Sequence, residues 1–198
     1  MSARNSYLKF PIHELLANRW SPRAFSTEAI PTGILRRIFE AARQAPSAYN
    51  DQPWHFVIAP KGSSEFEAIL DALVDWNKLW AGSSPMLVLA CSKRFFSNKP
   101  DVLNKVASYD TGQAVAHLSI QAMHEDVYVH QMSGFDINKM TSNLSLSESM
   151  EPVCVLALGF LGEKETLPED IAALENGFKP RNEFLSFVSG TAAEELFG

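Results

Sequence analysis

The stretch TGILRRIFEAARQAPSAYNDQPWHFVIAP, residues 32–60, contains two different periodicities within one short segment. In its first part apolar residues recur at helical spacing between charged ones; the apolar positions are Ile34, Leu35, Ile38, Phe39 and Ala42. Thr32 is a candidate N-cap for this helix, and Pro46 ends it because proline lacks the amide hydrogen that another turn needs. Residues 54–60 are rich in β-branched and aromatic side chains and predict a strand.

Helices and strands continue to alternate toward the C-terminus. Ser64 and Glu67 form a capping box that predicts a second helix, whose apolar face continues through Leu73 to Trp76 or Asn77. The remaining predicted elements are a helix from about Ser108 to His124, a short helix capped by Asp136, and strands at 86–92, 126–132, 152–160 and near 179–188. Because the elements are intermingled, without a repeat or a linker, we expect one mixed domain over residues 1–198.

The composition is that of an ordinary globular protein with an acidic balance. Of the 198 residues, 46% are hydrophobic and 20% are charged, and the formal net charge is -6. Such a chain does not attract a polyanion over a long distance, so we expect neither nucleic-acid nor anionic-membrane binding. A small anionic ligand remains possible because it needs only a local cluster of cations.

The two cysteines, Cys91 and Cys154, lie in apolar runs and belong to no CxxC pair, so we expect inert buried thiols. Reduced, cytoplasmic conditions fit such cysteines best. The N-terminal residues lack a continuous apolar signal core, and no apolar run approaches the length of a membrane span. We therefore expect a soluble cytoplasmic protein.

Several common catalytic patterns are absent from the sequence. It contains neither of the glycine-rich phosphate loops GxGxxG and GxxxxGK[ST], and no GxSxG nucleophile elbow. None of the five histidines lies in a metal-ligand pattern, so we expect no metal site. A nucleotide phosphate would therefore have to be held by side chains.

Three polar segments could supply those side chains: RWSPRAF (19–25), PSAYNDQPW (46–54) and KPRN (179–182). They place four cations in two tight clusters of an acidic chain: Arg19, Arg23, Lys179 and Arg181. Arginine suits a buried phosphate because its planar fork donates paired, charge-assisted hydrogen bonds. The alternative is that these are solvated turn residues.

The combination and order of these segments resemble the flavin-dependent nitroreductase family. RWSPRAF and the later APSAYNDQPW match its signature Arg-x-Ser-x-Arg/Lys-x-Phe followed by Ala-Pro-Ser-x-x-Asn-x-Gln-Pro-Trp. The likeness continues in order through NKLW, GSSPMLVLA, YDTGQAVAHLSIQA, MSGFD, PVCVLALGF and KPR. It covers nearly the whole chain, and Gln-Pro-Trp is its most specific part.

The resemblance implies an α+β fold with a mixed, mainly antiparallel sheet flanked by helices. It also implies a homodimer that holds FMN between its subunits, with the C-terminal segment of each chain extending onto the partner. NAD(P)H is then the co-substrate. The positions carried over for the cofactor are Arg19, Trp20, Ser21, Arg23, Ser47, Asn50, Gln52, Asn77, Ser133, Gly134, Lys179 and Arg181.

The family pattern gives these positions separate roles. Phosphate and ribityl contacts are implied for Arg19, Ser21, Lys179 and Arg181, and a contact with the pyrimidine edge for Arg23. The partner chain is implied to supply Ser47, Asn50 and Gln52, while Asn77 bonds the pyrimidine ring and the amides of Ser133 and Gly134 face the hydride-accepting side. No acid–base side chain is needed for hydride transfer, so no catalytic residue is expected beyond Arg23, which stabilises reduced flavin.

Aromatic residues near these segments have two possible roles. Tyr49 could reach the open face of the flavin and shape a substrate pocket, and Phe95 and Phe96 either line that pocket or pack in the core. We expect Trp20 and Phe25 to pack rather than to stack on the flavin.

The chain departs from the family after its central helix. A glycine-containing turn is usual there, whereas this chain has Glu125 and Asp126. The resemblance therefore leaves the local backbone geometry of that turn open.

The implied activity is that of an FMN-dependent NAD(P)H oxidoreductase working by ping-pong hydride transfer to a nitroaromatic, quinone or similar small-molecule acceptor. Two alternatives stay open. The same scaffold supports dehalogenation, azoline oxidation or destruction of the flavin, because fold does not settle chemistry. A non-catalytic flavin-binding protein is the third hypothesis.

Overall fold

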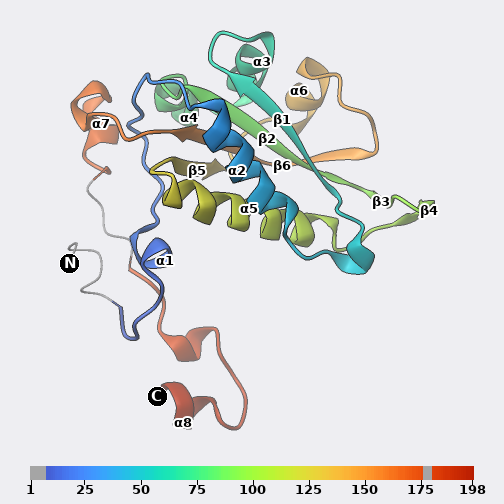
Figure 1. The fold of residues 1–198 in the computed structure, drawn as a ribbon, viewed down its shortest axis with the longest axis vertical. Coiled ribbons are helices and arrows are strands. Elements are labelled where there is room, and N and C mark those ends of the chain that lie inside the picture. Colours follow the sequence, from blue (N-terminus) through green and yellow to red (C-terminus); the bar gives the residue numbers. More distant parts are fainter. Residues whose placement is uncertain (1–7, 176–179) are drawn as a thin grey trace.

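The computed structural model describes residues 8–175 and 180–198, and its centre is a four-stranded sheet with the order β1-β2-β6-β5 (Figure 1). The strands are β1 (Trp54–Pro60), β2 (Met86–Lys93), β5 (Tyr128–Met132) and β6 (Met150–Gly159). Every neighbouring pair is antiparallel. This architecture confirms the expected α+β class.

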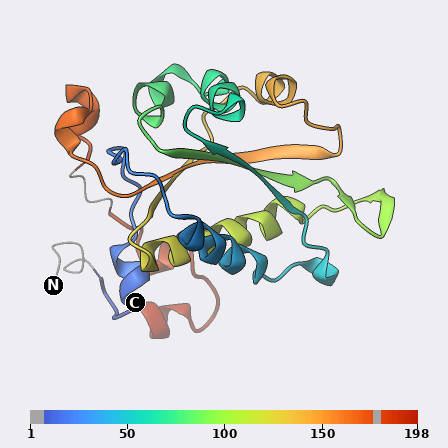
Figure 2. The same cartoon turned by 45° about the horizontal axis from the view of Figure 1, so that its top comes forward.

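Helices cover both faces of the sheet (Figure 2). The helices α2 (Thr32–Arg43) and α5 (Ala107–His124) lie on one face. On the other face are α3 (Ser64–Ala72), α4 (Asp75–Ala81) and α6 (Ile137–Asn143). Successive side chains of β2 enter the two opposite cores, Leu87 and Leu89 on one side and Val88 and Ala90 on the other. A strand that is buried on both faces is apolar at successive positions. This is why apolar and polar residues do not alternate in MLVLACS.

Of the three predicted helix caps, Asp136 is confirmed, since its Oδ1 accepts a hydrogen bond from the amide of Lys139 at 3.0 Å, and the other two are displaced by one residue. The N-cap of α2 is Pro31, and Thr32 is already helical. Ser63, not Ser64, caps α3, because its Oγ accepts a hydrogen bond from the amide of Phe66 at 3.1 Å. The capping residue must have non-helical backbone angles, and φ -80° with ψ 158° gives Ser63 that conformation.

The long helix expected from Ser64 to Asn77 is wrong. The chain leaves α3 at Leu73, which has ψ 154°, and α4 begins at Asp75. Leu73 forms an isolated antiparallel bridge with Phe135, and the amide of Val74 donates to the carbonyl of Gly134 at 3.0 Å. A distant loop therefore interrupts the helical periodicity by offering the backbone another partner.

A hairpin of β3 (Phe95–Phe96) and β4 (Lys99–Leu103) lies between β2 and α5 along the chain. It is held to the polar loop before β1 by Asp51, whose Oδ1 accepts a hydrogen bond from the amide of Ser97 at 2.8 Å. That loop contains the short 3-10 helix η2 (Ala48–Asn50). The hairpin and the loop thus form one unit at the end of the sheet.

The first described residues and the C-terminal part of the chain lie together, away from the sheet (Figure 1). α1 (Glu14–Asn18) runs beside a C-terminal extension, residues 180–198, that contains the 3-10 helix η4 (Phe184–Ser186) and α8 (Ala193–Phe197). The strand predicted near 179–188 is therefore wrong for the described residues, because Phe184 packs on several aromatic rings instead of a sheet edge. Its centroid lies 5.4 Å from Phe10, 5.7 Å from Phe187 and 5.4 Å from Phe197.

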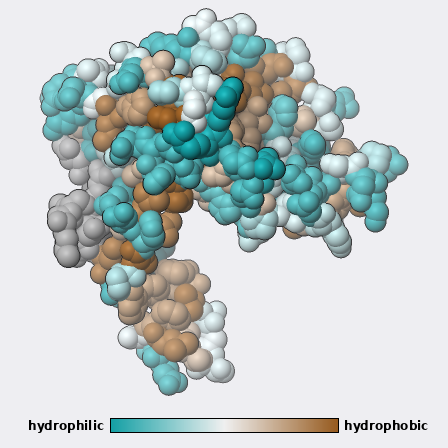
Figure 3. All heavy atoms as spheres, in the orientation of Figure 1, coloured by the Kyte–Doolittle hydropathy of each residue, from teal (hydrophilic) through white to brown (hydrophobic). Residues whose placement is uncertain are grey.

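The extension exposes much of its apolar surface (Figure 3). The exposed fraction is 65% for Phe187 and for Leu196 of the extension, and 53% for Phe10, which packs on it. Between the sheet and this extension the chain forms η3 (Lys164–Thr166) and α7 (Glu169–Ala172). Within the described ranges, no helix combines the length and apolarity that a bilayer crossing requires.

Both cysteines are free; Cys91 is buried as expected, whereas Cys154 is only half-buried. Burial raises the pKa of Cys91 to about 12 and that of Cys154 to about 11. Neither side chain is a thiolate at neutral pH, so both are poor nucleophiles.

Candidate cofactor-binding site

The segment RWSPRAF lies between α1 and α2 and is fixed against the end of β6. Phe25 forms an antiparallel bridge with Leu161, and the amide of Gly162 donates to the carbonyl of Ala24 at 3.0 Å. A Cβ at position 162 would come within 2.5 Å of the Phe25 backbone, so the close approach requires glycine. Phe25 itself is 4% exposed and stacks on Trp80, which confirms its packing role.

Arg19 and Arg181 come from opposite ends of the chain and lie close enough for their charges to interact. Burial lowers the pKa of Arg19, and the positive charge of Arg181 lowers it further by a smaller amount. Arg19 also donates to Ser21 Oγ at 3.4 Å. The structure therefore brings together three of the four residues predicted to hold a phosphate. The fourth, Lys179, lies outside the described residues.

Arg23 lies between a carboxylate and an aromatic ring. Its NH1 is 3.8 Å from Glu175 Oε2, and its guanidinium carbon is 5.9 Å from the Trp80 ring centroid. Arg23 Nε and Trp80 Nε1 are both buried without a hydrogen-bond partner among the described residues. Such orphaned donors are expensive in a folded protein and are typical of places that receive a ligand or water.

His130 joins β5 to the RWSPRAF segment. Its Nδ1 lies 2.8 Å from the carbonyl oxygen of Pro22, and since a carbonyl only accepts, Nδ1 carries the hydrogen. The ring also packs on Trp80 with centroids 4.4 Å apart. Burial lowers the pKa of His130 to about 4, with smaller contributions of the same sign from Arg23 and Arg19. His130 is therefore neutral at physiological pH.

Trp20 packs on an aromatic residue of β5. Its ring meets Tyr128 edge-on with centroids 6.2 Å apart. Trp80, Glu175 and His130 were not singled out from the sequence. Their roles depend on contacts with residues far away along the chain, which no local pattern reveals.

The loop before β1 has an unusual backbone. Tyr49, Asn50 and Gln52 have φ angles of 55°, 56° and 50°, a left-handed region that residues other than glycine seldom adopt. Ser47 Oγ accepts a hydrogen bond from the Gln52 amide at 3.0 Å, and the buried Asp110 of α5 accepts one from the amide of Ala48 at 2.9 Å. Backbone strain held by its surroundings is characteristic of functional loops.

The structure places Tyr49 beside Phe96 of the hairpin. The two rings meet edge-on with centroids 5.9 Å apart, and Tyr49 is 91% exposed. Phe95 and Phe96 are half-buried. The three aromatic residues predicted to shape a pocket therefore lie on adjoining segments, with Tyr49 projecting into solvent.

Asn77 and Gly134 are also brought together. Asn77 Nδ2 donates to the Gly134 carbonyl at 3.2 Å. A Cβ added at Gly134 would lie 2.9 Å from Asn77 Nδ2 and from Val74 Cγ2. The loop containing Ser133 is therefore pressed against the start of α4 at a position where a side chain does not fit.

Two groups of predicted site residues remain apart within one chain. The cations lie around RWSPRAF, before α2, whereas Ser47, Asn50 and Gln52 lie beyond the other end of α2 (Figure 1). A groove of about 560 Å³ between α2 and α5 is lined by Arg37, Gln44 and His117 among others, and none of the predicted site residues lines it.

An antiparallel sheet between two helical layers defines the α+β class of this domain. Comparison with known proteins identifies the family. The sequence model of the Nitroreductase family matches residues 16–79. The chain is 30% identical over 112 residues to an uncharacterised 15.4 kDa protein of Mycolicibacterium smegmatis, covering 57% of this chain and 72% of that protein.

A solved structure of an oxidoreductase containing FMN is 30% identical to the chain, with a TM-score of 0.84 over 96% of this chain and 97% of that one. A putative NADH dehydrogenase/NAD(P)H nitroreductase of Methanothermobacter thermautotrophicus is 22% identical over 160 residues, covering 78% of this chain and 80% of that protein. The chain belongs to the nitroreductase family.

Proposed function

We propose that the protein is an FMN-dependent NAD(P)H oxidoreductase that passes a hydride through bound FMN to a small acceptor such as a nitroaromatic or a quinone. The observation that carries the proposal is that Arg19 and Arg181 lie close together beside Ser21. The similar proteins support it: one contains FMN, and another is described as an NADH dehydrogenase/NAD(P)H nitroreductase.

The Arg19 and Arg181 pair fits a phosphate. The positive charge of Arg181 contributes to the lowered pKa of Arg19, and an anion between the two guanidinium groups would stabilise both charges. A phosphate ester carries about -1.5 to -2 charges at neutral pH and has oxygens that match guanidinium donors. Arg19 and Arg181 therefore bind and orient the phosphate end of the cofactor, and the Ser21 hydroxyl donates a further hydrogen bond.

Arg23 acts at the other end of the cofactor. FMN supplies a ring that accepts a hydride and becomes more negative when it is reduced. The Arg23 guanidinium, which is only 19% exposed, stabilises that negative charge more strongly than a solvated cation does. The backbone amides of Ser133 and Gly134 provide fixed donors on the loop that Asn77 holds in place.

A homodimer would complete the site. Ser47, Asn50 and Gln52 lie at the opposite end of α2 from the cations, so they would reach the cofactor from the partner chain. The exposed apolar extension supports this assembly, since surfaces of this kind typically dock on another protein. Tyr49 and Phe96 would then border the entrance for the acceptor.

The direct test is to purify the protein and examine its bound small molecules. We expect flavin absorbance, with FMN released on denaturation, and loss of the yellow colour when NADH or NADPH is added without oxygen. Failure to bind added FMN would overturn the cofactor assignment. Bound FMN that neither nicotinamide bleaches would overturn the proposed reductase activity, and product analysis after aerobic turnover would distinguish other flavin reactions.

A further inference from the structure

We propose that Glu175 is a positioning residue for Arg23, which aims the Arg23 guanidinium at the flavin and weakens its positive field there. The inference rests on the proposed FMN site. It concerns a carboxylate on the turn after α7 that belongs to none of the polar segments described from the sequence.

Glu175 holds both the backbone and the side chain of the RWSPRAF segment. Its Oε1 accepts hydrogen bonds from the amides of Arg23 at 2.5 Å and Ala24 at 2.8 Å. Its Oε2 lies 3.8 Å from Arg23 NH1 and has no hydrogen-bond partner among the described residues. One carboxylate therefore fixes where Arg23 leaves the main chain and where its guanidinium comes to rest.

The burial of Glu175 makes this contact strong. Its side chain is 4% exposed, and that of Arg23 is 19% exposed. A carboxylate at such a position needs a countercharge, because burying an unpaired charge costs several kcal/mol. Arg23 is the cation that the structure pairs with Glu175 in the described part of the chain.

Trp80 limits the other movements of Arg23. The guanidinium lies over the Trp80 ring, and Trp80 is 1% exposed between Phe25 and His130. With a fixed ring on one side and Glu175 on another, Arg23 has one favoured direction. This is the preorganisation that electrostatic stabilisation of a developing charge requires.

The two charges also act together on anything bound nearby. A cation paired with an anion presents a weaker field than the cation alone. Arg23 alone would make the site bind reduced FMN more tightly than oxidised FMN. Glu175 would therefore make this difference in affinity smaller. The reduced cofactor then gives up its electrons more readily to the acceptor.

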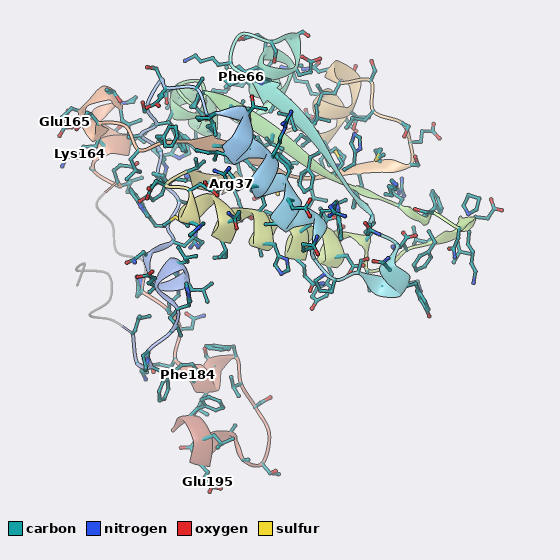
Figure 4. All side chains as sticks on the ribbon, viewed as in Figure 1. Arg37, Phe66, Lys164, Glu165, Phe184 and Glu195 are labelled. Carbon is teal, nitrogen blue, oxygen red and sulfur yellow. The ribbon has the colours of Figure 1, made fainter. Side chains whose placement is uncertain are left out.

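The test is the reduction potential of the bound flavin in Glu175→Gln. Glutamine keeps an oxygen for the Arg23 and Ala24 amides but removes the negative charge. We expect the ratio of affinities for reduced and oxidised FMN to rise about tenfold, which is a positive shift of about 30 mV for a two-electron couple. Glu165→Gln makes the same charge change on the exposed η3 turn (Figure 4) and should leave the potential unchanged.

Glu175→Asp is the second variant, in case the first does not fold. Aspartate keeps the charge but is one methylene shorter, so it cannot reach the two amides and the guanidinium together, and we expect a smaller shift of the same sign. A potential equal to that of Glu165→Gln in a folded, flavin-loaded variant would overturn the inference. Loss of folding in both variants would also overturn it, by assigning Glu175 to stability alone.

These outcomes are separate from the failure of the proposed function. If the unmodified protein does not bind FMN, or binds it without being reduced by a nicotinamide, the function itself fails. An unchanged potential in a variant that binds FMN leaves the function intact and removes only the role of Glu175.

Discussion

His130 is a single side chain whose protonation would place a positive charge in a buried position near Arg23 and Arg19. The ring donates to Pro22 through Nδ1 and packs on Trp80, both at the edge of the arginine cluster. The fold keeps the ring neutral by burying it beside cations. As the pH falls, protonation of His130 should therefore destabilise this part of the molecule early.

The first prediction concerns stability against pH. The folded-state pKa of His130, about 4, lies below the ordinary value of 6.5, so the unfolded chain binds the proton more readily. The contribution to stability is complete above pH 6.5 and is lost as pH falls toward 4, by at most about 1.4 kcal/mol per pH unit. Urea unfolding at several pH values measures it, and His130→Gln should flatten the curve.

His55→Gln on the exposed side of β1 is the matched control and should keep the slope of the unmodified protein. The Arg37–Glu125 pair does not account for a loss of stability between pH 6.5 and 4.5. The hydrogen bond from Arg37 lowers the pKa of Glu125 from 4.5 to about 2, so the stability that this pair contributes is lost only as the pH falls below 4.5. An equal slope in His130→Gln would contradict the role given to His130.

The second prediction concerns the space at Gly134. Alanine there would place its Cβ 2.9 Å from Val74 Cγ2 and from Asn77 Nδ2, so the loop or α4 must shift. We expect Gly134→Ala to lower the free energy of unfolding by about 1–3 kcal/mol. Chemical denaturation measures the change. Gly33→Ala, where the nearest atom is 3.7 Å away, should cost nothing, and equal effects of the two would refute the packing argument.

At the scale of whole elements, the turn after α5 shows how this chain manages without glycine. Asp126 adopts φ 57°, and the amide of Val127 donates to the carbonyl of Ala122 at 2.9 Å, which closes the helix in a Schellman arrangement. Aspartate tolerates the left-handed region better than most residues but less well than glycine. Asp126 therefore occupies the left-handed position of this turn without the glycine that is usual in the family pattern.

The third prediction follows from this turn. Asp126→Gly should raise the free energy of unfolding by up to about 1 kcal/mol, because glycine occupies the left-handed conformation without strain. Thermal and urea unfolding provide the measurement. Asp126→Val should have the opposite effect, since β-branched residues are strained there. A stabilised valine variant would show that the turn geometry is not what matters at this position.

Elements differ in how far local sequence determines them. β2 and β6 were predictable because burial on both faces leaves continuous apolar runs, and α2 because its apolar stripe has helical spacing. The break between α3 and α4 was not, because its cause is the Gly134 carbonyl on a loop far along the chain. The same holds within the candidate site: Arg19 and Arg181 are visible by residue type, whereas Glu175 lies in an ordinary acidic turn.

At the scale of the whole molecule, the separation of the two polar groups at the ends of α2 is the main feature to explain. A second copy of the chain is the simplest way to bring Asn50 and Gln52 to the arginine cluster, and the extension offers the apolar surface for it. Assembly and cofactor binding would then depend on each other, because each completes a site for the other.

The fourth prediction tests that assembly. Phe184 lies at the centre of the aromatic contacts that give the extension its shape (Figure 4). Phe184→Ala should weaken dimerisation by at least tenfold, which is about 1.4 kcal/mol, while the sheet stays folded. Sedimentation velocity over a dilution series, with circular dichroism as the check on folding, gives the answer. A monomeric unmodified protein at micromolar concentration would contradict the dimer itself.

The proximity of the two chain ends has a consequence for biosynthesis. Arg19 leaves the ribosome early, but its neighbour Arg181 and the ring of Phe184, which packs on Phe10, are translated after every strand of the sheet. The sheet can form on a nascent polypeptide, whereas the proposed anion-binding pair is complete only after Arg181 has been added. A premature stop codon before position 181 would therefore yield a chain that folds its centre yet lacks half of that pair.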